Sequence, residues 1–183
     1  FGLNSPTGVE ISELYDSMSQ YPTHISSPEY KKYITQQRDA DAKESDYKWS
    51  AGDTIRTAIG QSYNNYTSAL MSKYVATLAN GGTRYSMHFL NKITNNDGKT
   101  EEEYQPKVES KIEIKKENLD AIFKGMFLVT TGPRGTLRNY FKDFPVDVAA
   151  KSGTAQQSSK RSEHTTFVAF APLEDPQISV CVI

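Results

Sequence analysis

The sequence lacks most features that would assign a function at once. It has one cysteine, Cys181, so no internal disulfide can form, and the apolar strand pattern around it favours a small buried residue. Its apolar runs are far shorter than the roughly 20 residues that a helix needs to cross a bilayer. The 21 basic and 22 acidic residues are interspersed, without a basic block. We therefore expect no nucleic acid partner and no membrane contact within this chain.

Other absences are equally useful. The first residues of the sequence show no signal peptide pattern, and the first residue is Phe1. His24 and His88 have no cysteine or carboxylate at ligand spacing, so the sequence predicts no metal site. Ile183 ends the chain on an apolar strand without a turn or polar tail. Its 183 residues fit one compact domain or most of one, and we expect residues 1–183 to be the C-terminal portion of a single, longer domain.

Three helices are predicted from capping residues and from apolar residues at helical spacing. Ser27 as the cap and Pro28 at the first position predict a helix over 28–38, within a polar surface excursion over 15–48. Thr67 as the cap, an apolar stripe and the terminal pair Gly81-Gly82 predict a helix over 68–80. A second apolar stripe predicts a helix over 119–130.

The segments between these helices carry weaker signals. Gly52-Asp53-Thr54 reads as the cap of another short helix. A strand is predicted over 83–93, followed by a turn at 95–98. Residues 101–116 are mostly charged, and apolar residues alternate only weakly with polar ones among them. Gly132-Pro133-Arg134-Gly135 ends the helix over 119–130, and a short helical turn over 137–141 follows. Arg134 is either a solvated loop residue or a contact for an anionic group.

The most informative stretch is residues 146–157, which read as a strand rich in small side chains. Within it, Lys151-Ser152-Gly153-Thr154 combines an ammonium group, two hydroxyls and a glycine that lets another backbone come close. Such a strand edge suits an extended peptide that ends in a carboxylate. It is also compatible with an ordinary exposed strand that carries lysine as a guard against edge pairing.

Two further strands, 164–172 and 177–183, follow after short polar turns. Together with residues 146–157 they predict an antiparallel meander. Because the helices precede it, the expected fold class is α+β, an antiparallel sheet with helices packed on its faces. The period of two places Lys151 on the opposite face from Ser152 and Thr154, so only a twisted edge strand would let all three reach one cleft.

Several blocks, in order, resemble the transpeptidase domain of class B penicillin-binding proteins. The strongest is the Lys-Ser-Gly-Thr tetrad, since Lys-Thr-Gly is a signature of penicillin-recognising enzymes. The other matching blocks are Trp49, Gly52-Asp53-Thr54, Ala58-Ile59-Gly60-Gln61, Leu78-Ala79-Asn80-Gly81-Gly82, Gly125-Met126, Gly135-Thr136 and Phe167-Val168-Ala169-Phe170-Ala171-Pro172. The resemblance covers nearly the whole chain. Mild departures, such as Ala150 where glycine is common, affect only local loops.

The resemblance implies serine acyl transfer without a cofactor. In that family the serine of Ser-x-x-Lys attacks the D-Ala-D-Ala bond, and a Ser-x-Asn loop and the Lys-Ser/Thr-Gly strand complete the site. Carried over to this sequence, Lys151 would supply positive potential and orient the Ser-x-Asn hydroxyl. Ser152 and Thr154 would bind the substrate carboxylate, and the Thr154 N–H would be one oxyanion-hole donor. Gly153 would admit the substrate, and Gln156 lies on the same strand face as Thr154.

Two literal matches to the remaining motifs are interpreted as coincidences. Ser45-Asp46-Tyr47-Lys48 lies in a charged stretch, whereas the chemistry needs a buried helix start where desolvation lowers the lysine pKa. Ser62-Tyr63-Asn64 directly follows a block that lies downstream of the Ser-x-Asn motif in the family. We therefore expect the nucleophile and the Ser-x-Asn loop to lie before Phe1.

The resemblance also implies partners and a location. These are the D-Ala-D-Ala end of a peptidoglycan stem peptide, β-lactam antibiotics and the upstream half of the same domain. The site would lie on the extracytoplasmic face of the bacterial membrane, and the chain alone would be inactive. Two alternatives stay open: a serine β-lactamase or β-lactam sensor of the same superfold, and a non-catalytic peptidoglycan-binding module.

Overall fold

A computed structural model describes residues 1–11, 23–155 and 162–183, which form two compact units. The smaller unit comprises Gly2–Pro6 and Ser12–Thr67, and the larger comprises Phe1, Thr7–Ile11 and Ser68–Ile183. The described part of the predicted surface excursion over 15–48 belongs to the smaller unit. That the whole chain forms part of one domain stays a prediction.

The smaller unit is helical. Its helices are α1 (Pro28–Arg38), α2 (Glu44–Tyr47) and α3 (Ala51–Ala58). The predicted start of α1 is confirmed, because Ser27 Oγ accepts a hydrogen bond of 3.1 Å from the Tyr30 N–H and Pro28 occupies the first turn. Ile34 is the buried residue of α1, in keeping with the thin apolar face of its sequence.

The predicted cap of α3 at Gly52-Asp53-Thr54 is wrong. The helix begins at Ala51, and Ser50 is its N-cap. Ser50 Oγ accepts from the Asp53 N–H at 3.2 Å, and the Asp53 carboxylate accepts from the Ser50 N–H at 2.8 Å. This reciprocal pair is a capping box, in which aspartate occupies the third helical position and serine starts the helix.

Asp53 is the centre of a buried polar cluster in this unit. Its side chain is 2% exposed and accepts hydrogen bonds from Lys31 Nζ at 2.9 Å and from Arg56 Nη2 at 3.0 Å. The hydrogen bond from Lys31, followed by those from the Ser50 hydroxyl and N–H, holds the pKa of this carboxyl far below its ordinary value.

Acid should therefore destabilise the smaller unit. The folded-state pKa of Asp53 lies below the value of about 3.9 expected in the unfolded chain, so its contribution is present above that pH and is lost as pH falls below it. Trp49, whose indole donates to Thr54 Oγ1 at 2.9 Å, is the single tryptophan and reports unfolding by fluorescence. We expect the urea midpoint to drop steeply below about pH 4, and Asp53→Asn to flatten this drop.

Asp41→Asn is the matched control, because it removes an exposed carboxylate from the same unit. It should leave the steep acid-dependent drop in place. If Asp53→Asn loses stability with falling pH as steeply as the wild-type chain, the pairing of Asp53 is not the source of the acid sensitivity.

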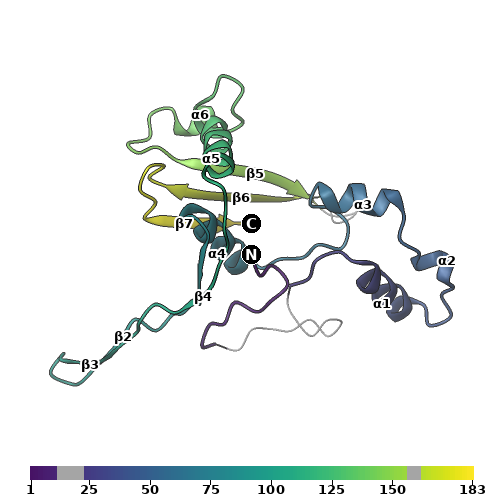
Figure 1. Ribbon diagram of the computed structural model, residues 1–183, viewed down its shortest axis with the longest axis horizontal. Helices are drawn as coiled ribbons and strands as arrows, with labels where there is room; N and C mark the ends of the chain where they lie inside the picture. The colour runs from purple at the N-terminus through teal and green to yellow at the C-terminus, as the bar shows by residue number, and fades with distance from the viewer. Residues whose placement is uncertain (12–22, 156–161) are drawn as a thin grey trace. The chain divides into compact units, whose positions relative to one another are not determined.

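The larger unit contains the sheet. Its strands and helices, in order, are α4 (Ser68–Ala79), β1 (Thr83–Tyr85), β2 (Lys92–Thr94), β3 (Thr100–Glu103), β4 (Val108–Lys111), α5 (Lys116–Thr131), α6 (Arg138–Phe141), β5 (Ala149–Ala155), β6 (His164–Ala171) and β7 (Ile178–Val182). The last three strands pair antiparallel in the order β5-β6-β7 (Figure 1). The predicted meander and the predicted helices over 68–80 and 119–130 are confirmed.

Both faces of this sheet are covered, which confirms the α+β prediction. On one face, Ala149, Val168 and Phe170 form a buried cluster with Val75 of α4, and Phe123 of α5 packs against it. On the other face, a second cluster of Val148, Ala150 and Ala169 packs against Leu137 and Phe141, at and within α6. The alternation of these residues along β5 and β6 follows the pleat, in which successive side chains point to opposite faces.

The predicted strand over 83–93 is wrong in its extent. It is divided into β1, which pairs with β4, and β2, which pairs with β3. The register shifts after Arg84 in the first pair and after Ile93 in the second. A short segment at 86–91, which lies outside both strands, separates β1 from β2. The β2–β3 ribbon extends away from the sheet (Figure 1), and its turn at Asn95–Gly98 was predicted correctly.

The end of α4 and the following strand are held by a close backbone contact. Gly81 and Gly82 both have positive φ, as the prediction of a glycine helix end requires. A Cβ at Gly82 would lie 2.2 Å from the carbonyl oxygen of Ile112, so this position admits glycine only.

Within the described ranges, no helix is both long and apolar enough to cross a membrane.

Candidate functional site

The site predicted from the tetrad lies where β5 leaves the core. Ala149 and Ala150 are fully buried, whereas Lys151, Gly153 and Thr154 are exposed and Ser152 is half-buried. Because β5 is the outermost strand of the β5-β6-β7 sheet, its far edge has no strand partner among the described residues. The N–H and C=O groups on that edge are thus free to pair with an added strand.

The side chains of the tetrad alternate across the sheet. Lys151 lies opposite Val168 in the register, on the face that α4 and α5 cover. Ser152 lies opposite Phe167, on the face that Leu137 and Phe141 cover, and Thr154 lies two residues further along that same face. The Lys151 ammonium donates a hydrogen bond to the Ser152 carbonyl oxygen. The predicted alternation is therefore observed.

The loop after α5 contributes a third hydroxyl. Thr136 Oγ1 and Ser152 Oγ are 3.4 Å apart, and either of them can donate to the other. Thr130 Oγ1 donates to the Val148 carbonyl oxygen at 2.7 Å in a buried hydrogen bond that ties the end of α5 to β5. Sequence reasoning noted Gly135-Thr136 only as part of a resemblance and did not assign Thr136 to the site.

A shallow pocket of about 420 Å³ adjoins the start of the exposed part of β5. It is lined by Lys151 and Ser152 of β5, by the loop 132–136, and by Gly125, Leu128 and Val129 of α5. Its volume falls in the range of roughly 300–1,000 Å³ that is usual for small-ligand sites. Two of the lining residues, Lys151 and Arg134, are cationic and none is acidic, which favours an anionic ligand.

Gly153 leaves open space beside the strand. A Cβ built at this position would meet no atom within 4 Å. The protein's own packing therefore does not require glycine here. Glycine inside a strand often marks a place where another backbone comes close. Gly153 fits this role, because the protein's own packing does not explain the glycine.

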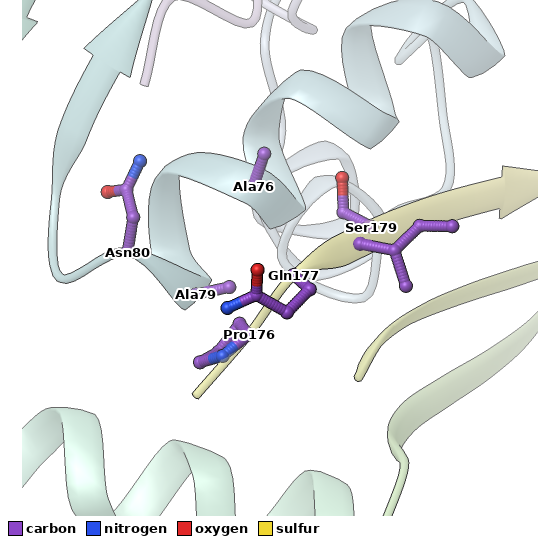
Figure 2. Close-up of a pocket in the computed structure, with 7 residues that line it drawn as sticks. Ala76, Ala79, Asn80, Pro176, Gln177 and Ser179 are labelled. Atoms are coloured by element: carbon purple, nitrogen blue, oxygen red, sulfur yellow. The ribbon is translucent and has the colours of Figure 1, made fainter. Parts of the chain in front are cut away.

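A smaller pocket of about 220 Å³ lies between the end of α4 and the start of β7 (Figure 2). Ala76 and Ala79 of α4 and Asn80 just after it line one side, and Pro176, Gln177 and Ser179 line the other. None of its lining residues is charged. It therefore lacks the cation that an anionic substrate would need.

The two motif matches rejected from the sequence lie in the smaller unit. Ser45 is exposed on the four-residue helix α2, where its hydroxyl donates to Asp46 at 3.2 Å. Ser62 adopts a positive φ of 73° in the turn after α3. Neither serine starts a buried helix, as a lysine-activated nucleophile requires. Gln156, the remaining predicted site residue, lies outside the described residues.

No set of three or more His, Cys, Asp or Glu side chains in the described ranges is placed to hold a metal ion. Burial raises the pKa of the Cys181 thiol, so it is a poor nucleophile at neutral pH.

The sequence also matches a known protein family. Residues 27–183 match the penicillin binding protein transpeptidase domain, and the chain belongs to that family. The peptidoglycan D,D-transpeptidase MrdA of Escherichia coli K12 is 31% identical to it over 197 residues, a match that covers 100% of this chain and 28% of the relative. The chain therefore spans less than a third of that relative's length.

Solved structures agree. Penicillin-binding protein 2B of Streptococcus pneumoniae R6 superimposes with a TM-score of 0.71 at 25% identity, covering 98% of this chain and 26% of that one. Penicillin-binding protein 2 of Pseudomonas aeruginosa, solved with WCK 5153, gives a TM-score of 0.64 at 30% identity, covering 87% of this chain and 32% of that one. The recognition of a class B transpeptidase domain from the sequence blocks is confirmed.

Proposed function

We propose that this chain forms one wall of the active site of a serine-type D,D-transpeptidase that cross-links peptidoglycan outside the cytoplasmic membrane. The observation that carries the proposal is the exposed Lys151–Thr154 segment on the free edge of β5, beside a pocket with two cations. A stem peptide ending in D-Ala-D-Ala would add a strand along this edge. The relative from Escherichia coli is named for this activity.

In this proposal each residue of the tetrad has a separate role. Lys151 supplies positive potential and orients the hydroxyl of a Ser-x-Asn loop. Ser152 and Thr154 hold the substrate carboxylate, and the Thr154 N–H stabilises the oxyanion that forms when a serine attacks the carbonyl. Gly153 provides the space for the substrate backbone. A β-lactam, which carries a carboxylate beside a reactive carbonyl, would occupy the same position.

The nucleophile is proposed to lie in a part of the full-length protein that precedes Phe1. The test is the intact mass of this chain and of the full-length protein after incubation with excess penicillin. We expect a covalent adduct on the full-length protein and none on the 183-residue chain. An adduct on this chain that maps to Ser45 would overturn the assignment, because Ser45-Asp46-Tyr47-Lys48 would then be the reactive motif.

The lifetime of the adduct separates the transpeptidase from a β-lactamase of the same fold. A transpeptidase holds the acyl group until an amine acceptor arrives, so the adduct should persist for far longer than its formation takes. Rapid loss of the adduct with release of hydrolysed penicillin would favour the β-lactamase instead.

A further inference from the structure

We infer that Arg134 is a further contact for the donor carboxylate that Ser152 and Thr154 hold, and that it strengthens the preference of the enzyme for donors that end in a free carboxylate. This inference rests on the proposed function and extends it to a residue outside the Lys-Ser-Gly-Thr segment. It begins from the pocket beside β5, whose two charged lining residues are Lys151 and Arg134.

The loop that carries Arg134 is fixed before any ligand binds. The Gly135 N–H donates to the Gly132 carbonyl oxygen at 2.9 Å, so residues 132–135 form a β-turn with Pro133 and Arg134 at its centre. The Leu137 N–H donates to the Val129 carbonyl oxygen at 3.0 Å and ties the loop to α5. A Cβ at Gly135 would lie 2.5 Å from the carbonyl oxygens of Leu128 and Val129. The backbone of Arg134 is thus held at the pocket wall.

The positive charge of Arg134 is not neutralised by an ion pair within the described part of the chain. No carboxylate there forms an ion pair with it, and the same holds for Lys151. Two cations that share a pocket repel each other, so both gain when an anion binds between them. A guanidinium binds a carboxylate through two parallel hydrogen bonds, which fixes orientation as well as charge.

The remaining lining residues indicate the chemistry of the ligand group next to the carboxylate. Leu128, Val129 and Pro133 are apolar, and the hydroxyls of Ser152 and Thr136 lie at the β5 side of the pocket. A small apolar side chain beside a carboxylate fits this mixture. A terminal alanine residue has that chemistry. A peptide paired with the edge of β5 would place its last residue in this pocket if it ends near Lys151.

The test compares two donor pentapeptides that differ only at the end, one with a free terminal carboxylate and one with a terminal amide. Full-length wild-type protein and the variants Arg134→Ala and Arg134→Lys are assayed for release of the terminal residue. We expect Arg134→Ala to lower kcat/KM for the acid about tenfold, mainly through a higher KM, because a charge-assisted hydrogen bond is lost. The same variant should leave kcat/KM for the amide unchanged, and Arg134→Lys should retain part of the preference.

Arg138→Ala is the matched control, because Arg138 is an exposed arginine of α6 that does not line the pocket. Equal losses for acid and amide in Arg134→Ala, or the same effect from Arg138→Ala, would overturn the inference. No change in Arg134→Ala would overturn it as well. If wild-type protein releases no terminal residue from either donor and forms no penicillin adduct, the proposed function fails and the inference fails with it.

Discussion

Lys151→Ala in the full-length protein is expected to lower the rate of acylation by penicillin by about 10²- to 10³-fold. The lysine is exposed at the edge of β5, lines the pocket and has no carboxylate partner among the described residues. In the proposed mechanism its positive charge would supply the potential that favours the developing oxyanion and the ligand carboxylate. The measurement is the second-order rate of adduct formation, followed by mass spectrometry or with a fluorescent penicillin.

The control variant is Lys142→Ala, which removes a lysine at the end of α6 whose side chain is 64% exposed. It should acylate at the wild-type rate. Both variants should unfold at nearly the wild-type temperature, since exposed substitutions usually change stability by less than about 0.5 kcal/mol. Lys151→Arg, which keeps the charge, should recover part of the rate. Acylation of Lys151→Ala at the wild-type rate would remove Lys151 from the mechanism.

Much of the larger unit could be predicted because its signals are local. The apolar stripe over residues 68–80 and the glycines that follow it specify a helix and its end within one segment. The three strands of the meander follow one another directly, so alternation and short turns were enough to predict their antiparallel pairing. The tetrad was found by its motif, and the alternation of its side chains follows from the period of two.

The features that could not be predicted depend on contacts between distant residues. Lys73 lies among apolar residues of α4 and is 6% exposed, but the carboxylate that neutralises it, Glu109, is 36 residues away. Thr136 and Ser152 meet across 16 residues because α5 is tied to β5 at Thr130. The sequence alone leaves two roles open for Arg134, a solvated loop residue or a contact for an anionic group, because only the folded loop places it at one pocket with Lys151.

Glu109→Ala is expected to lower the free energy of unfolding of the larger unit by about 3–5 kcal/mol. Glu109 accepts hydrogen bonds from Lys73 Nζ at 2.8 and 2.9 Å, and its carboxylate lies 2.8 Å from Arg84 Nε. The Lys73 side chain is 5% exposed and its other partner is the Thr7 carbonyl oxygen. Removal of the carboxylate leaves a buried ammonium without a counter-charge, which costs far more than the loss of one surface ion pair.

The contacts of Lys73, Glu109 and Arg84 join α4, β1, β4 and the segment at Thr7. The loss of stability should therefore be visible where these elements meet. Hydrogen exchange of the α4 amide groups in the full-length protein should accelerate in Glu109→Ala and stay unchanged in Glu113→Ala, which removes an exposed glutamate four residues on. The double variant Lys73→Met with Glu109→Leu removes both charges and should cost less than Glu109→Ala alone. If the double variant is as unstable as Glu109→Ala, packing around the pair and not its charge holds α4 to β4.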